Sequence, residues 1–159
     1  MNLCLVGTGY VGLVSGVCFS DLGNKVICVD KNPDKIELLN NAKIPIYEPG
    51  LEELVKKNLK SGNLTFTTSL KDAVSKSDII FICVGTPTKK KSNAADLSQI
   101  FNVANQIKSY INKYKIIVTK STVPVTTGDK IEKIIKQRKQ KKFFSVVSNP
   151  EFLREGEAI

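Results

Sequence analysis

Three glycines close to the N-terminus have the spacing of a turn that binds a diphosphate. Gly7, Gly9 and Gly12 lie in the segment GTGYVG, which follows a short apolar run and opens an amphipathic helical pattern. The first glycine permits a tight turn, the second lets a pyrophosphate approach the backbone, and the third lets the helix pack closely on the strand. The backbone N–H groups of Tyr10 and Val11 would face the phosphates at the positive end of the helix dipole. The spacing therefore predicts a dinucleotide-binding turn.

An acidic residue follows at the position where a bound dinucleotide needs one. Asp30 ends the next predicted strand, 18 residues after Gly12, and the usual offset is about 20 residues. Its carboxylate would accept hydrogen bonds from the ribose hydroxyls of NAD and repel the 2′-phosphate of NADP. Lys31 and Lys35 offer a cation nearby, which leaves the choice open here, although the acid favours NAD. The alternative interpretation of Asp30 is a surface acid near the start of the next helix.

The composition removes several other kinds of catalytic site. The chain has no histidine, so a Ser-His-Asp hydrolase and a zinc enzyme with histidine ligands are both excluded. Acid–base chemistry would have to come from Asp, Glu, Lys, Tyr, Ser, Thr or water. The cysteines lie in apolar runs without CxxC spacing, and they predict buried thiols in a reducing cytoplasm, with no disulfide framework and no metal site. They are Cys4, Cys18, Cys28 and Cys83.

The charge of the chain is strongly basic. Its net charge is +9, from 24 Lys and Arg against 15 Asp and Glu. Two lysine-rich clusters, residues 89–91 and 136–142, predict either a solvated surface or a site for an anionic partner. Neither cluster has interleaved aromatic residues for base stacking, so we expect no nucleic-acid binding, and a basic interaction protein is the competing function class. No apolar stretch approaches 18 residues and the N-terminus lacks a basic signal sequence, so we expect a cytoplasmic protein without a membrane span.

Apolar periodicity indicates the elements that must position these residues. Short β-rich runs alternate with helical patterns, which is typical of βαβ units and of a parallel sheet covered on both faces. The predicted strands span residues 3–6, 26–29, 64–67, 79–84, 116–119 and 143–147. The predicted helices span residues 11–22, 51–59, 96–111 and 128–137, with one that begins at Pro33 after an Asn32 cap and one that runs from a Ser69 cap to Val74.

This alternation predicts the fold and the edge at which a ligand binds. A chain of 159 residues has room for one domain, here an α/β, Rossmann-type doubly wound parallel sheet of about six strands with helices on both faces. We expect residues 1–150 to form the NAD-binding domain and residues 151–159 to begin a substrate-binding loop. Because ligands of such sheets bind at the carboxyl ends of the strands, the loops at residues 83–87, 120–124 and 148–156 are candidates for the rest of the site. The irregular crossover at residues 41–50 is a candidate functional insertion.

Seven segments spread over the whole chain match the motifs of one family. They are GTGYVGL (7–13), VDKN (29–32), IPIYEPGL (44–51), CVGTPT (83–88), ADLS (95–98), KSTVPV (120–125) and NPEFLREG (149–156). The chain thus resembles the UDP-glucose 6-dehydrogenase family, and GDP-mannose dehydrogenases share several of these motifs. The resemblance implies an NAD-dependent, four-electron oxidation of a UDP-sugar substrate, UDP-glucose to UDP-glucuronate, in polysaccharide biosynthesis. It also implies a homodimer.

The resemblance further implies roles for individual residues. The positions that match NAD-contacting residues are Val11, Asp30, Lys35, Thr86, Thr122 and Glu155. Glu151 and Thr122 match catalytic residues, the first a carboxylate with an acid–base role and the second a residue that orders water near the nicotinamide. Glu151, Phe152, Leu153 and Arg154 match a loop along the sugar nucleotide. A carboxylate and a hydroxyl at strand ends can position a water, and the alternative for Glu151 is an acid that starts a helix after Pro150.

The chain departs from the family's pattern in three places. Thr126 stands where the family usually has glycine, and it would be strained if its φ were positive. Residues 89–93 replace a turn that often holds Asp-Gly. The family's catalytic cysteine, together with a lysine and an asparagine, lies in later segments that are not found before Ile159. Because Cys83 falls in a predicted buried strand, it cannot replace that nucleophile, and we expect this chain alone to be a dinucleotide-binding module without turnover.

Overall fold

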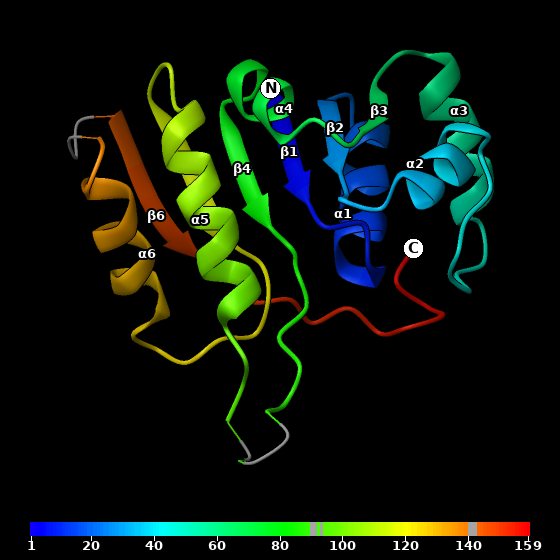
Figure 1. Ribbon diagram of the computed structural model, residues 1–159. Coiled ribbons are helices and arrows are strands. Elements are labelled where there is room, and N and C mark those ends of the chain that lie inside the picture. Colours follow the sequence, from blue (N-terminus) through cyan, green and yellow to red (C-terminus); the bar gives the residue numbers. More distant parts are fainter. Residues whose placement is uncertain (90–91, 93, 140–142) are drawn as a thin grey trace.

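A parallel β-sheet forms the middle layer of the computed structural model, which describes residues 1–89, 92, 94–139 and 143–159 (Figure 1). Over these residues the sheet has six strands in the order β3-β2-β1-β4-β5-β6, and each neighbouring pair runs parallel. The strands are β1 (Asn2–Val6), β2 (Lys25–Val29), β3 (Leu64–Thr67), β4 (Ile79–Ile82), β5 (Lys115–Thr119) and β6 (Phe144–Ser148). The order reverses between β1 and β4, as in a doubly wound dinucleotide-binding fold. The predicted fold class is confirmed.

The helices lie on both faces of the sheet, and two of them begin at the caps that the sequence predicts. The helices are α1 (Tyr10–Asp21), α2 (Pro33–Asn40), α3 (Leu51–Lys60), α4 (Leu70–Lys76), α5 (Ser98–Tyr110) and α6 (Thr127–Lys136). The Asn32 side chain accepts hydrogen bonds from the amides of Asp34 and Lys35 at 3.0 and 3.2 Å, and the Ser69 hydroxyl accepts one from the Asp72 amide at 3.3 Å. Both predicted caps are confirmed, because each side chain satisfies amides that the first helical turn leaves unpaired.

Several predicted boundaries differ from the observed ones, and two of these differences have a clear local cause. The predicted strand 79–84 ends at Ile82. The Cys83 amide makes one more bond, to the Val6 carbonyl at 2.9 Å, and the neighbouring strand β1 then ends at the Gly7 turn. The helix predicted from residue 96 begins at Ser98, because the Asp96 carboxylate accepts the Ser98 amide at 2.9 Å and stands before the helix.

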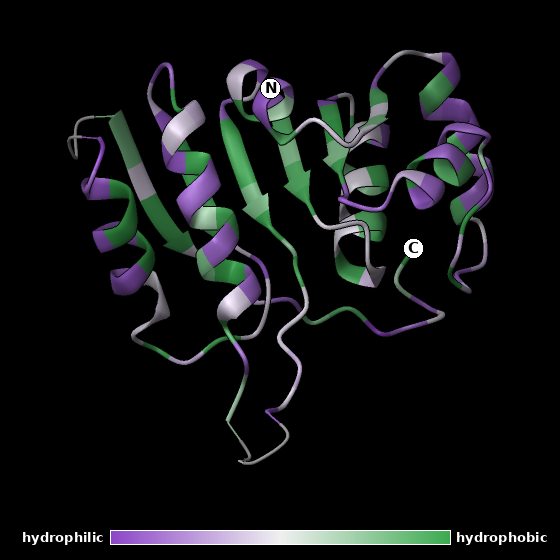
Figure 2. Cartoon of the chain, viewed as in Figure 1, coloured by the Kyte–Doolittle hydropathy of each residue, from purple (hydrophilic) through white to green (hydrophobic). Residues whose placement is uncertain are grey.

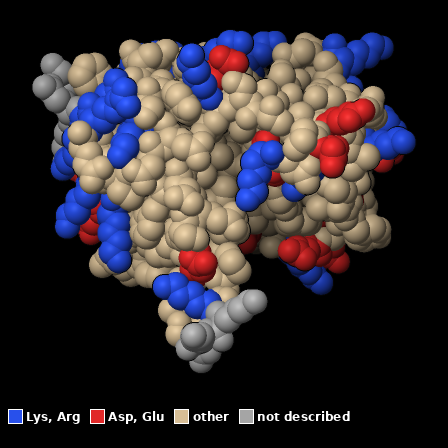
Figure 3. All heavy atoms as spheres, in the orientation of Figure 1, with Lys and Arg blue, Asp and Glu red and all other residues tan. Residues whose placement is uncertain are grey.

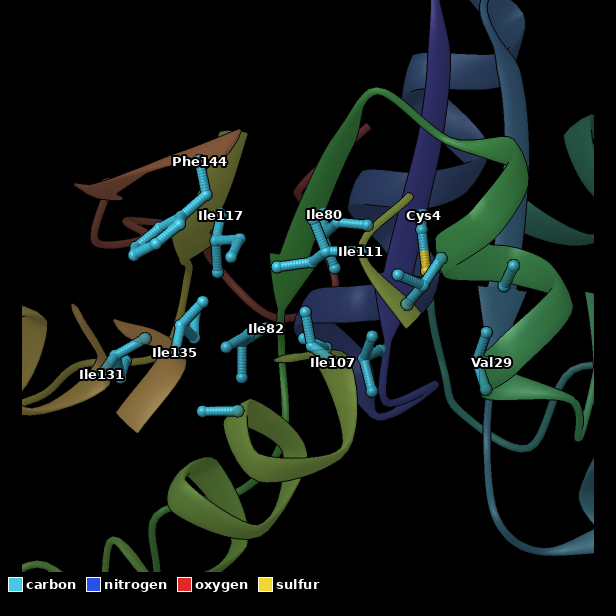
Figure 4. Packing of buried hydrophobic residues seen from close by; sticks show 14 of the residues in the cluster. Cys4, Val29, Ile80, Ile82, Ile107, Ile111, Ile117, Ile131, Ile135 and Phe144 are labelled. Atoms are coloured by element: carbon cyan, nitrogen blue, oxygen red, sulfur yellow. The ribbon is translucent and has the colours of Figure 1, made fainter. Parts of the chain in front are cut away.

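Apolar side chains from both faces of the sheet form two cores. Strand residues appear hydrophobic in Figure 2 and the outward sides of the helices hydrophilic, as a covered parallel sheet requires. On one face, α4, α5 and α6 pack on the sheet through the residues drawn in Figure 4, among them Ile82, Ile107, Ile117 and Ile131. On the other face, α1, α2 and α3 pack through a second set, which includes Leu5, Leu13, Val17, Leu39 and Val55. Each such side chain contributes roughly 1.5–3 kcal/mol by its burial.

The composition led to two expectations, one about a membrane span and one about the lysine clusters, and the helices and the surface bear on them. None of the described helices is long and apolar enough to cross a membrane. In Figure 3 the lysines and arginines lie mostly around the rim of the drawn face, with acidic residues among them. In the lysine cluster at residues 136–142, Lys136 pairs with Glu132 at 2.6 Å. Residues 90–91 of the other cluster and residues 140–142 of this one lie outside the described residues.

Candidate functional site

The glycine turn between β1 and α1 has the geometry that its spacing predicts. Gly7 has φ +103°, and a Cβ there would lie 2.9 Å from the Cys83 carbonyl oxygen. A Cβ on Gly12 would lie 1.9 Å from the Gly7 carbonyl oxygen, so only glycine lets α1 approach the turn this closely. A Cβ on Gly9 would meet nothing within 4 Å. The first and third glycines are therefore required by the turn itself, while the second leaves open space beside the helix N-terminus.

Asp30 lies directly against this turn. Its Oδ2 accepts hydrogen bonds from the Thr8 amide at 3.0 Å and the Thr8 hydroxyl at 2.8 Å, and its Oδ1 accepts the Asn32 amide at 3.1 Å. The Lys35 ammonium lies 3.4 Å from Oδ2. Partial burial opposes ionisation of Asp30, but the Thr8 and Asn32 hydrogen bonds and the Lys35 charge leave its pKa below the usual value. Asp30 is therefore an anion at neutral pH, and its hydrogen bonds to Thr8 stabilise the glycine turn.

A cavity of about 340 Å³ joins the turn, the acid and the crevice between β1 and β4, within the range of small-ligand sites. Its wall includes Gly7, Gly9, Asp30 and Lys31, together with the residues that follow β4. Helix α5 adds polar side chains at a spacing of three and four residues, which the sequence reasoning did not single out. They are Gln99, Asn102 and Gln106. Their recurrence on one helical stripe, between apolar positions, is a signal that could have found them.

The loops after β4, β5 and β6 lie side by side, as their place at one edge of the sheet predicts. The Ser121 hydroxyl donates to the Val84 carbonyl at 2.7 Å, and the Thr86 hydroxyl donates to the Thr122 carbonyl at 3.4 Å. The Lys120 ammonium donates to the Asn149 side-chain oxygen at 3.1 Å. Thr86 and Thr122 are thus brought together by their loops, although neither belongs to the cavity wall.

The backbone of Thr126 shows whether threonine is strained at this position. Its φ is −83°, in the ordinary range, so threonine in place of the family's usual glycine introduces no backbone strain. Residues 90, 91 and 93 of the other departing segment lie outside the described residues.

The segment 151–159 crosses the carboxyl edge of the sheet and ends near α1 (Figure 1). The Glu151 carboxylate accepts the Leu153 amide at 2.8 Å, and no described residue after Pro150 is helical, so the alternative in which Glu151 starts a helix is wrong. Phe152 is 92% exposed. Leu153 packs against the core of the α1 face. Arg154 pairs with Glu157 at 2.8 Å.

The residues that the sequence suggests for catalysis and for the nicotinamide therefore lie outside the cavity wall. Glu151, Thr122 and Glu155 do not belong to its wall, whereas Asp30 does and Lys35 reaches Asp30. Val11 opens α1 next to Tyr10, whose hydroxyl reaches the segment 151–159. The structure thus separates the candidates at or beside the cavity wall from those in the C-terminal segment and in the loop that holds Thr122.

The thiols do not suit a nucleophile's role. Cys4, Cys28 and Cys83 are buried and Cys18 is half-buried, and all of them are free. Burial raises the pKa of each thiol, and that of Cys83 to about 12. A thiol that stays protonated at neutral pH attacks poorly. The described residues also contain no cluster of side chains suited to a metal ion.

Known proteins are similar to this chain in sequence and in fold. The UDP-glucose/GDP-mannose dehydrogenase family, NAD binding domain, matches the chain over residues 1–159. The UDP-glucose 6-dehydrogenase of Rhizobium meliloti (strain 1021) is 52% identical over 159 residues, which are 100% of this chain and 36% of that protein. The UDP-glucose 6-dehydrogenase TuaD of Bacillus subtilis (strain 168) is also 52% identical, over 99% of this chain and 34% of that protein.

A solved structure agrees closely with the fold. The ternary complex of GDP-mannose dehydrogenase from Pseudomonas aeruginosa matches with a TM-score of 0.94 and 42% sequence identity. The match covers 99% of this chain and 38% of that one. The chain accordingly spans about a third of the length of the curated relatives it matches.

Proposed function

Because the chain belongs to the UDP-glucose/GDP-mannose dehydrogenase family and corresponds to its NAD-binding domain, we propose that it binds NAD for the oxidation of UDP-glucose to UDP-glucuronate in a protein of its relatives' length. The observation that carries the proposal is the cavity that joins the glycine turn to an ionised Asp30 at the switch point of the sheet. NAD supplies a hydride acceptor when it is bound. The chain supplies the site that binds and orients it.

The residues fit the two ends of such a cofactor differently. Tyr10 and Val11 are the first residues of α1, where helix geometry leaves the amides without an intrahelical partner. These amides and the open space over Gly9 could bind a diphosphate. Asp30 keeps lone pairs for ribose hydroxyls, and Lys35 is held near it by charge. We assign residues 1–150 to the cofactor domain and residues 151–159 to the start of the substrate loop.

The candidates outside the cavity belong to the nicotinamide and sugar side of the proposal. Thr86, Thr122 and Glu155 would lie toward the nicotinamide, and Glu151 would hold or move a proton on water. Phe152, Leu153 and Arg154 would line the sugar nucleotide.

Asp30→Ala is expected to weaken NADH binding by about 1–3 kcal/mol, which is roughly 5- to 150-fold. The carboxylate is a charged acceptor for the ribose, and its removal also releases the Thr8 amide and hydroxyl. Fluorescence titration of the purified chain with NADH and NADPH measures both effects, because loss of the anion should also reduce the preference for NADH. Glu37→Gln, on the exposed side of α2, is the control for loss of one negative charge. Unchanged NADH affinity in Asp30→Ala would argue against the assigned role, and no NADH binding by the unaltered chain would end the proposal.

The unaltered chain is expected not to sustain NADH production when it is mixed with NAD and UDP-glucose, because the second of the two oxidation steps cannot proceed. Its thiols are buried or half-buried with raised pKa values, so it lacks an activated nucleophile for the second oxidation step. Absorbance at the NADH band during a long incubation checks this, with one of the full-length relatives as the positive control. Steady NADH production above background would show that the chain holds a complete active site.

GDP-mannose is the second candidate substrate. The structure of the GDP-mannose dehydrogenase supports it at 42% identity, but the two UDP-glucose 6-dehydrogenases are more similar, at 52%. We therefore favour UDP-glucose.

A further inference from the structure

Glu48 is a buried carboxylate that the proposed cofactor site does not use. It lies in the crossover between α2 and α3, within the IPIYEPGL segment, and is 4% exposed. A carboxylate removed from water is unfavourable unless several donors surround it. The donors around Glu48 therefore indicate what the crossover is built to hold.

The donors come from two distant parts of the chain. Glu48 Oε2 accepts a hydrogen bond from the Gly156 amide at 2.8 Å, and Oε1 accepts one from the Ala158 amide at 2.8 Å. The Tyr10 hydroxyl donates to Oε2. Glu48 thus links the first residue of α1 to a segment more than 100 positions away in the sequence.

Tyr10 also contacts the segment 154–156 directly. Its hydroxyl oxygen lies 3.2 Å from the Arg154 carbonyl oxygen and accepts the Gly156 amide at 3.1 Å. Gly156 has φ +85°, a conformation that glycine adopts without strain. The path of the segment beside Tyr10 is therefore specified by hydrogen bonds and by backbone geometry.

Apolar packing and charge support the same arrangement. Leu153 and Ala158 pack with Tyr10 and Ile46 against the core of the α1 face. The hydrogen bond from Tyr10 and those from the segment's amides hold the pKa of Glu48 below its usual value, despite burial. Burial and the bond to Glu48 raise the pKa of Tyr10. At neutral pH the pair is thus a carboxylate and a neutral phenol, the states that this hydrogen bonding requires.

We propose that Glu48 and the Tyr10 hydroxyl form a clamp that holds residues 154–158 over the N-terminus of α1 and couples their position to the dinucleotide at the glycine turn. Tyr10 carries one of the amides assigned to the diphosphate, and Glu155 lies inside the clamped segment. Both residues act by positioning. The coupling rests on the proposed NAD binding, whereas the clamp itself stands on the contacts alone.

Hydrogen exchange of the Gly156 and Ala158 amides, followed by NMR on the chain without ligand, tests the clamp. Glu48→Gln keeps the shape but replaces one accepting oxygen, and Tyr10→Phe removes only the hydroxyl. We expect exchange at one or both amides to become at least about tenfold faster in each variant. Glu37→Gln and Tyr114→Phe, which alter the same residue types far from the clamp, should leave both rates unchanged. Unchanged rates in both clamp variants would overturn the clamp.

NADH titration of the same proteins tests the coupling. NADH should slow exchange at Gly156 and Ala158 in the unaltered chain, and both variants should bind NADH several-fold more weakly, since linkage between two sites is reciprocal. The double variant should bind about as weakly as either single one, because the two residues act as a unit. A purely structural role would leave the NADH affinity unchanged, and that result would overturn the coupling. If the unaltered chain binds no NADH while the variants still lose protection, the clamp is supported and both the coupling and the proposed function fail.

Discussion

Gly12→Ala is expected to lower the free energy of unfolding by about 3 kcal/mol, the upper range for inserting one methyl group into a packed interior. The new Cβ would lie 1.9 Å from the Gly7 carbonyl oxygen and 3.0 Å from the Cys83 Cβ. Neither neighbour can yield easily, because the first is backbone in a turn at φ +103° and the second follows the central strand β4. Helix α1 must therefore move away from β1 and open the core on that face.

Urea unfolding followed by circular dichroism measures this change. Gly128→Ala is the matched control, because a Cβ there meets only the Val146 side chain at 4.0 Å. In α6 that change should stabilise the chain slightly, by about 0.4–1 kcal/mol. Equal stability of Gly12→Ala and the unaltered chain would mean that the close approach of α1 to the turn is not what holds it in place.

The features that could be predicted from the sequence are those set by short-range spacing. The glycines, Asp30 and the caps at Asn32 and Ser69 each depend on residues a few positions apart or on a strand-turn-helix unit, so local rules specify them. The sheet could also be predicted, because six β-rich runs separated by helical patterns leave few alternatives to a doubly wound order. The structure confirms the fold and the geometry of the turn.

The features that could not be predicted depend on contacts between distant segments. The amide donors of Glu48 lie more than 100 residues away in the sequence, and the residues around Glu48 do not predict them. Lys115 is fully buried, where its ammonium donates to the Ser77 carbonyl at 2.6 Å and burial lowers its pKa. A lysine before a strand is ordinarily taken as exposed, so the sequence placed the start of β5 one residue too late. The polar stripe of α5 can be recognised from its spacing, but its place in the same cavity wall as Asp30 depends on the fold.

Gly9→Val is expected to weaken NADH binding by roughly 100-fold, about 2.7 kcal/mol, while the folded chain stays nearly as stable. Gly9 precedes α1 with φ −68° and ψ −175°, an extended conformation that valine adopts readily. A Cβ there meets no protein atom within 4 Å, so the added methyl groups would fill the space that we propose for the diphosphate and screen the helix N-terminus. The loss in stability should not exceed about 1 kcal/mol, because valine is a poorer N-cap residue than glycine.

Gly9→Val and Gly12→Ala together separate binding from folding at one turn. If Gly9 serves the ligand and Gly12 serves the packing, fluorescence titration should show that Gly9→Val loses NADH affinity. The same variant should still unfold with full cooperativity. Urea unfolding should show the larger loss in Gly12→Ala. Gly128→Ala, remote from the turn, should change neither the affinity nor the cooperativity. NADH affinity in Gly9→Val equal to that of the unaltered chain would place the diphosphate away from this turn, because no phosphate could reach the α1 amides past a valine side chain.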